Sequence, residues 1–329
     1  MVDVPGRRAG FPGRPLHLLR EPLPPAPRQL LSGAGSGSTR RGTISGRAGR
    51  AGWFVNAAAL NDLADEAIDR VNLASARGRP LVSGHATRGE LGLVAVVAAV
   101  VAIGVSAVVG WAVTVVVAAG LAIKAAYSLR PIRISHRGAL APLTVSAAFV
   151  VVPYLVGALA VTNTIEPADL ALFPGLYVAF IGRILPKDFR DAAGAAMFGK
   201  WTFLLRHGRV TTCRVSTACW ILGPTAIVAA LPDPAAVGGL ELAFMLCAVH
   251  GLVCLASETD PVAEQVIIGA IVQAGRGLGI VVPAHLTMLD QGWPRSWPVL
   301  VLAAIGVTSV VAYAATYAVR GRVTAIRPY

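Results

Sequence analysis

The sequence predicts an all-α protein, a polytopic bundle of transmembrane helices around a central cavity. Its 329 residues have a mean hydropathy of +0.65 and only 14% charged side chains. This composition is too apolar for an ordinary soluble domain. Apolar runs recur along the chain. Each has roughly the ~20 residues that a helix needs to cross a bilayer. The runs lack the alternation of a barrel strand, so helices are the remaining way to satisfy the backbone in lipid.

About eight full spans are expected, with one truncated span before them. The first long apolar run divides at Gly110-Trp111 into two helices. The stretch 51–60 is apolar but too short to cross a bilayer, so it resembles the last half of a membrane helix. The full spans are expected at 91–109, 111–128, 139–161, 168–186, 209–231, 236–256, 262–285 and 297–319.

Residues 1–50 have a different composition from the rest of the chain. They are rich in Arg, Pro and Gly and show little hydrophobic periodicity. Such segments do not bury a core, so disorder is expected here. The abrupt change near residue 50 also suggests an artefact of reading frame or start site. The membrane domain is expected over 51–329.

The net charge of +12 has two interpretations. In a soluble protein it would suggest a nucleic-acid partner, but in a membrane protein basic residues collect in cytoplasmic loops. The basic residues here cluster in alternate loops, so no nucleic-acid partner is expected. We expect an integral protein of the cell (inner) membrane, with the basic loops facing the cytoplasm. The four cysteines lie singly in apolar spans, which indicates packing rather than metal binding.

The stretch NDLADEAID (61–69) concentrates carboxylates next to an apolar helix. Asp62, Asp65 and Asp69 are spaced i, i+3 and i+7, which places them on one face of a helix. Carboxylates so close together repel unless a cation neutralises them. Mg²⁺ prefers such oxygen ligands and commonly bridges them to phosphate. A magnesium-diphosphate site is therefore predicted, against the simpler alternative of a solvated helix end.

A second copy of the spacing favours the magnesium site. KDFRDAAGA (187–195) repeats it with Asp188 and Asp191, whereas Ala195 stands where the first copy has an acid. Acidic residues at a membrane edge are functional candidates. Two metal sites facing one cavity are therefore expected.

Several motifs together resemble the UbiA superfamily of intramembrane prenyltransferases. The acidic stretch matches the family's NDxxDxxxD motif, and the second copy is similar to its DxxDxxGD motif. The resemblance covers roughly 51–320. Its segments are NDLADEAIDRVN (61–72), RGRPLVSG (77–84), AYSLRPIRISHRG (126–138) and KDFRDAAGAAMFGKWTFLLRHG (187–208).

The resemblance implies Mg²⁺-dependent transfer of a prenyl group from a polyprenyl diphosphate to an acceptor. The acceptor is a small molecule, with aromatic rings of quinone or lipid biosynthesis among the candidates. Asp62, Asp65 and Asp69 would carry one Mg²⁺, and Asp188 and Asp191 the other. The family also implies that Asn61 positions the diphosphate and that the reaction takes place in membrane lipid.

Basic side chains near the two motifs are candidates for holding the diphosphate. Arg79 is the best placed because it lies in the RPLxSG-like tract, and Lys124, Lys187 and Arg130 are weaker candidates. Tyr127 either lines the cavity or is an interfacial aromatic residue. Two glycines, Gly194 and Gly199, are expected to permit a turn after the second motif.

Two departures from the family pattern leave alternatives open. Ala195 replaces the last aspartate of the second motif, and the family's first helix and part of its second are not recognisable before Asn61. One alternative is therefore an inactive truncated remnant of such an enzyme. The other is a cation-coupled transporter, which predicts carboxylates at mid-membrane and broken helices.

Overall fold

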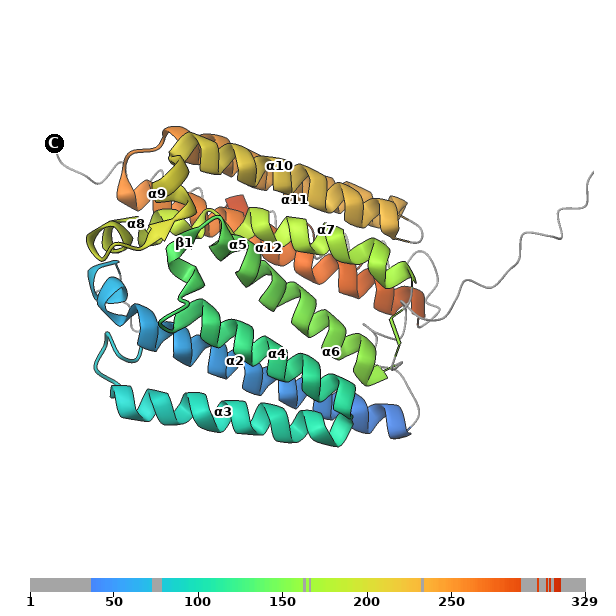
Figure 1. The fold of residues 1–329 in the computed structure, drawn as a ribbon. Coiled ribbons are helices and arrows are strands. Elements are labelled where there is room, and N and C mark those ends of the chain that lie inside the picture. Colours follow the sequence, from blue (N-terminus) through green and yellow to red (C-terminus); the bar gives the residue numbers. More distant parts are fainter. Residues whose placement is uncertain are drawn as a thin grey trace, which may run out of the picture.

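The computed structural model describes residues 37–72, 79–161, 164–165, 167–231, 234–290, 301, 306, 308 and 311–314. It is a bundle of long helices (Figure 1), which confirms the predicted all-α membrane fold. The long helices and short connecting elements are, in order, α2 (Gly37–Asn72), α3 (Arg88–Val109), α4 (Trp111–Ser128), η1 (Ile134–His136), β1 (Arg137–Gly138), α5 (Leu140–Ser146), η2 (Ala147–Val151), α6 (Val152–Val161), α7 (Pro167–Ile184), α8 (Lys187–Met197), β2 (Trp201–Thr202), α9 (Phe203–His207), α10 (Arg209–Ala230), α11 (Ala235–Ser257) and α12 (Pro261–Asp290).

The expected spans correspond closely to helices. Within the described residues, six helices are long and apolar enough to cross a membrane, or seven if α7 and α8 are counted as one bent span. The expected break at Gly110 separates α3 from α4. The span expected at 139–161 consists of α5, the π-helical turn η2 and α6. The span expected at 297–319 lies largely outside the described residues.

Helix α2 differs from the truncated span and the disordered segment that the sequence suggests. It begins at Gly37 and has 36 residues, which is a length of about 54 Å. The apolar stretch 51–60 is therefore the middle of a long helix. Adding residues to an existing helix is much easier than nucleating one, so the Arg- and Gly-rich sequence before residue 51 continues the turns of the packed part. Residues 1–36 lie outside the described residues.

The bundle consists of two packed halves that lie side by side (Figure 1). In one half α2, α4 and α6 share a core that includes Trp53, Val117 and Val152, and α3 packs along α2. In the other half α7, α10, α11 and α12 share a larger core that includes Trp220 and Phe244. Apolar side chains also cover the outside of the bundle, as expected of a surface in contact with lipid.

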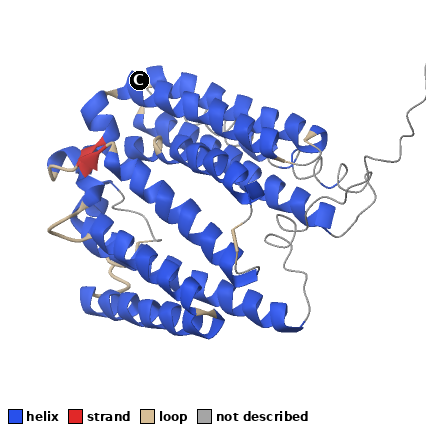
Figure 2. Ribbon diagram, turned by 45° about the vertical axis from the view of Figure 1, so that its right-hand side comes forward, coloured by secondary structure: helices blue, strands red, loops and turns tan. Residues whose placement is uncertain are grey.

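The short elements gather at one end of the bundle. Helix α8 bends by 54° from the end of α7, and the loop after it pairs with the loop after α4. That pairing is the two-residue parallel ladder of β1 and β2 (Figure 2), in which Arg137 lies opposite Trp201. It holds together two loops that are far apart in the sequence, and both predicted aspartate motifs lie at this end.

Candidate active site

A cavity of about 860 Å³ lies between the two halves at this end of the bundle. Side chains from α2, α4, α5, α7, α8 and α12 line it. All ten site residues predicted from the sequence are among them, namely Asn61, Asp62, Asp65, Asp69, Arg79, Lys124, Tyr127, Lys187, Asp188 and Asp191. The two motifs, more than a hundred residues apart, therefore face the same space. Arg130 does not line this cavity but a separate, shallower hollow outside it.

One face of α2 supplies the carboxylates of the first motif. Asp62, Asp65 and Asp69 all reach the cavity, as the i, i+3, i+7 spacing predicts. Asp65 and Asp69 are 7% and 4% exposed. Buried carboxylates need a compensating charge, and the structure provides one for each.

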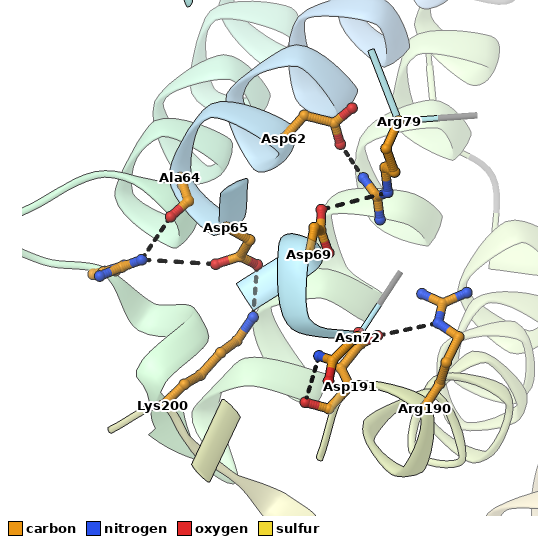
Figure 3. Close-up of polar contacts among 10 residues, drawn as sticks. Asp62, Ala64, Asp65, Asp69, Asn72, Arg79, Arg190, Asp191 and Lys200 are labelled. Atoms are coloured by element: carbon orange, nitrogen blue, oxygen red, sulfur yellow. Dashed lines mark hydrogen bonds and ion pairs between the residues drawn. The ribbon is translucent and has the colours of Figure 1, made fainter. Parts of the chain in front are cut away.

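Arg79 bridges two of these carboxylates (Figure 3). Its guanidinium forms an ion pair with Asp62, and its Nε lies 3.4 Å from Asp69 Oδ2. The planar guanidinium suits such a double contact better than a lysine does. Arg79 thus lies between the carboxylates and within the cavity, where it can also reach an anion.

Asp65 is paired with two different cations. Lys200 Nζ lies 2.6 Å from its Oδ2 (Figure 3), and Arg133 lies 3.7 Å from its Oδ1. Arg133 also donates a hydrogen bond to the carbonyl of Ala64 at 2.7 Å. Asp65 Oδ1 accepts no hydrogen bond within the described residues, so this buried oxygen retains its capacity to bind another partner.

The second motif lies on α8, which packs across the end of α2. Asp191 pairs with Arg190 at 3.1 Å. Asn72, the last residue of α2, donates to the Asp191 carbonyl at 2.9 Å and accepts from the Gly194 amide at 2.8 Å. A Cβ at Gly194 would lie 2.8 Å from the Ile68 carbonyl. The glycine therefore permits the close approach of the two helices rather than a turn.

Residue 195 lies behind the cavity wall. Ala195 is fully buried and does not line the cavity, and its carbonyl accepts a hydrogen bond from the Lys200 amide at 2.8 Å. The turn expected after the second motif is at Gly199, whose φ of +64° favours glycine.

The inner part of the cavity is aromatic. Phe149 stacks on Phe180 at 5.8 Å and contacts Phe54 at 5.5 Å. These three rings come from η2, α7 and α2, so they join the two halves. Lys124 Nζ lies 4.8 Å from the ring centres of both Tyr127 and Phe149. The cavity therefore has the aspartates at one end and aromatic rings at the other, with the cations of Lys124 and Arg183 against those rings.

His136 lies in the loop beside the carboxylates. Its burial lowers its pKa below the ordinary value of 6.5, and the positive charges of Arg133 and Lys200 lower it further. Its Nε2 is buried and accepts no hydrogen bond from the described residues. The imidazole is thus kept neutral at pH 7 and adds no charge to the site.

The donor set suits magnesium if a substrate contributes ligands. Within the described ranges, no three Asp, Glu, His or Cys side chains lie close enough to hold one metal ion, and the three carboxylates of the first motif are paired with cations. Mg²⁺, however, is commonly held by one or two carboxylates, waters and substrate phosphates. The aspartates of the two motifs, including the Asp65 oxygen without a hydrogen bond, fit that mode.

Several residues of the site were not predicted from the sequence, among them the aromatic residues Phe54, Phe149 and Phe180 of the cavity wall. Arg183, Arg190 and Lys200 line the cavity, and Asn72 joins α2 to α8. Asn72, Arg190 and Lys200 lie within the quoted motif segments, but a single sequence does not reveal which distant residues they contact.

Comparison with known proteins identifies the family. A sequence model of the UbiA prenyltransferase family matches residues 51–265. The chain belongs to the UbiA prenyltransferase family. The match includes both aspartate motifs and most of the spans that surround the cavity. No curated protein sequence matches the chain significantly.

Solved structures of UbiA homologues have the same fold. A UbiA homologue from Archaeoglobus fulgidus bound to DMAPP and Mg²⁺ matches with a TM-score of 0.58 at 14% identity, covering 77% of this chain and 92% of that one. The same homologue bound to GPP and Mg²⁺ matches with a TM-score of 0.58 at 14% identity, over 77% of this chain and 93% of that one. A structure of digeranylgeranylglyceryl phosphate synthase matches with a TM-score of 0.53 at 14% identity, over 80% and 88%.

Proposed function

We propose that this chain transfers a prenyl group from a polyprenyl diphosphate to a small-molecule acceptor, with Mg²⁺ as cofactor. The observation that carries the proposal is the cavity with two chemically different ends. One end combines the aspartates of two motifs with cations, which suits a metal-bound diphosphate. The other end is lined by aromatic rings, which suits a prenyl chain.

The charged end would hold the leaving group. Asp62, Asp65 and Asp69 on one side and Asp188 and Asp191 on the other would carry the ions. Bound Mg²⁺ supplies positive charge to the diphosphate as negative charge develops on it. Arg79, Lys124 and Lys187 would contact the diphosphate oxygens, and Asn61 would orient them through its amide.

The aromatic end would protect the reacting carbon. The bond between the prenyl carbon and the diphosphate oxygen breaks, and the diphosphate leaves with the electron pair. The allylic carbon then bonds to the acceptor, which loses a proton. Tyr127 and Phe149 already hold the Lys124 ammonium against their ring faces, so these rings can stabilise positive charge. Apolar walls also keep water away from it.

The chain lies in the membrane, and its orientation follows from charge. The site loops carry most of the basic residues, so they would face the cytoplasm. We place the protein in the cell (inner) membrane, where both the lipid-like donor and the acceptor reach the cavity. Candidate acceptors remain small aromatic rings of quinone or lipid biosynthesis.

Product identification tests this proposal. The purified chain in liposomes is incubated with geranyl, farnesyl or geranylgeranyl diphosphate, Mg²⁺, and a panel of phenols, hydroquinones and glycerol phosphates. We expect at least one prenylated product by mass spectrometry, formed with stoichiometric diphosphate and abolished by a metal chelator. Folded protein that forms no product and releases no diphosphate with any pair would favour the inactive remnant. Cation flux across the liposomes without product would favour the transporter.

A further inference from the structure

Lys200 carries the ammonium group that the proposed chemistry leaves without a role. It belongs to neither aspartate motif and lies in the loop between α8 and β2. Its Nζ nevertheless lies 2.6 Å from Asp65 Oδ2, across 135 residues of sequence. The Lys200 side chain is 11% exposed and lines the cavity. An almost buried ion pair at this place is a specific feature of the site.

Backbone hydrogen bonds on both sides of Lys200 hold it in this position. Its amide donates to the Ala195 carbonyl at 2.8 Å, and its own carbonyl accepts from the Thr202 amide at 2.9 Å. The preceding Gly199 has a φ of +64°, which a residue with a side chain rarely adopts. The β1–β2 ladder begins at the next residue, Trp201. The lysine backbone is therefore fixed, while its four-carbon side chain can swing.

The ion pair and a metal ion compete for the same carboxylate. If Mg²⁺ binds Asp65, an ammonium at 2.6 Å from that carboxylate lies close to a divalent cation and is repelled by it. Arg133 is less able to leave, because it also donates to the Ala64 carbonyl. Lys200 is the cation that can move, and the cavity it lines is the space proposed for the diphosphate.

We propose that Lys200 couples the binding of Mg²⁺ to that of the diphosphate. With Mg²⁺ alone, the lysine opposes the ion at Asp65. When the diphosphate arrives with the ion, Lys200 leaves Asp65 and pairs with a diphosphate oxygen. Lys200 thus disfavours the ion alone and favours the ion together with its substrate, which is a positive coupling between two ligands. This proposal rests on the proposed function, since it takes the diphosphate as the second ligand.

The test compares two variants that both retain a hydrogen-bond donor for Asp65. Lys200→Gln removes the charge, and Lys200→Arg keeps it. Isothermal titration calorimetry in detergent measures the affinity for Mg²⁺ alone, and then for inorganic diphosphate at a fixed concentration of free Mg²⁺.

In Lys200→Gln we expect Mg²⁺ alone to bind about fivefold tighter or more, because one repelling charge is gone. We expect diphosphate to bind about tenfold more weakly, because one charge-assisted contact is lost. In Lys200→Arg both affinities should stay within about threefold of wild type.

The affinities for Mg²⁺ and for diphosphate are expected to change in opposite directions in Lys200→Gln, and this distinguishes the proposed role from a structural one. A lysine that only supports the fold would weaken both affinities together in Lys200→Gln, and that result would overturn the proposal, as would an unchanged Mg²⁺ affinity. Arg88→Gln is the matched control, because Arg88 pairs with Glu66 on the outer side of α2 and does not line the cavity; it should change neither affinity. If Lys200→Gln does not fold, Lys200→Met replaces it. Wild-type protein that binds no diphosphate would contradict the proposed function, while the Mg²⁺ titration would still test the competition at Asp65.

Discussion

Asn72 and Gly194 form the joint between the two aspartate helices. The Asn72 side chain accepts from the Gly194 amide at 2.8 Å and donates to the Asp191 carbonyl at 2.9 Å. One amide side chain therefore closes a pair of hydrogen bonds with the backbone of α8, and Figure 3 shows the one to Asp191. Through it the end of the first motif helix sets the position of the second motif.

We expect Asn72→Ala to damage both stability and activity. The change removes the two hydrogen bonds that join α2 to α8, at a cost of about 2 kcal/mol in the free energy of unfolding. It also releases α8 from α2, so prenyl transfer should fall by at least about tenfold. Thermal unfolding in detergent and product formation at low temperature measure the two effects.

Asn56→Ala is the matched control for this change. Asn56 lies on the same helix and donates to the Ala95 carbonyl at 2.8 Å, but it holds α3 and does not line the cavity. Asn56→Ala should lower stability to a similar extent and leave the rate of prenyl transfer at low temperature unchanged. Equal loss of activity in both variants would show that Asn72 has no special role in joining the motifs.

The effect of an Arg79 substitution on activity should depend on the shape of the side chain that replaces it. Lysine keeps the charge but not the planar fork that contacts both Asp62 and Asp69. Arg79→Lys should therefore raise KM for the prenyl diphosphate about tenfold, and Arg79→Gln should reduce kcat/KM about a hundredfold. The mostly exposed Arg70, which pairs with Glu66, supplies the control Arg70→Gln. Full activity of Arg79→Gln would remove Arg79 from the site.

Phe149→Ala should shift the preference of the cavity toward longer prenyl chains. Phe149 joins Phe54 and Phe180 in the aromatic wall, and Phe54 lies eight residues before Asp62 on α2, which is about 12 Å along the helix. Removing the ring opens the cavity beyond this wall. The ratio of kcat/KM for geranylgeranyl over geranyl diphosphate should rise by about tenfold or more.

Trp111, which is 82% exposed, provides the aromatic control for the ratio of kcat/KM between the two diphosphates. Trp111→Ala removes a ring that does not line the cavity and should leave the chain preference unchanged. A ratio that stays constant in Phe149→Ala would mean that the prenyl chain leaves the cavity by another route.

Stability should fall below pH about 6.5 in a way that depends on His136. The pKa of this imidazole is lowered in the folded protein, chiefly by burial. As the pH falls below the ordinary value of 6.5, the unfolded chain takes up the proton first, so stability decreases until the lower folded pKa is passed. His136→Gln should make the decrease in melting temperature between pH 7.5 and 5.5 shallower. His85→Gln, which removes an exposed imidazole, is the control, and parallel curves for wild type and His136→Gln would contradict the prediction.

The spans and the carboxylate face could be predicted because they depend on local periodicity. The breaks at Gly110 and after the second motif are encoded by single glycines, and Asp62, Asp65 and Asp69 follow helix geometry. The expectation failed at the start of α2, where a Gly- and Arg-rich composition suggests a linker but the turns continue from the packed helix.

Contacts between distant segments could not be predicted. Lys200 contacts Asp65 across 135 residues of sequence, from a loop that the β1–β2 ladder holds in place, and no local sequence pattern predicts a ladder of two residues. Gly194 was interpreted as a turn residue, although its actual role is to admit Asn72. Arg79 could be predicted because it lies in the RPLxSG-like tract of the family.

Mg²⁺-dependent diphosphate release by Asp62→Asn, measured beside Glu66→Gln, tests most directly whether the cavity is a prenyltransferase site. Both variants remove one negative charge from α2, four residues apart. Asp62 faces the cavity, whereas Glu66 pairs with Arg70 and Arg88 outside it. A prenyltransferase site predicts release in wild type and Glu66→Gln, and a loss of about a hundredfold or more in Asp62→Asn. Equal rates in the two variants, or release that does not require Mg²⁺, would show that the cavity is not a Mg²⁺-dependent prenyltransferase site.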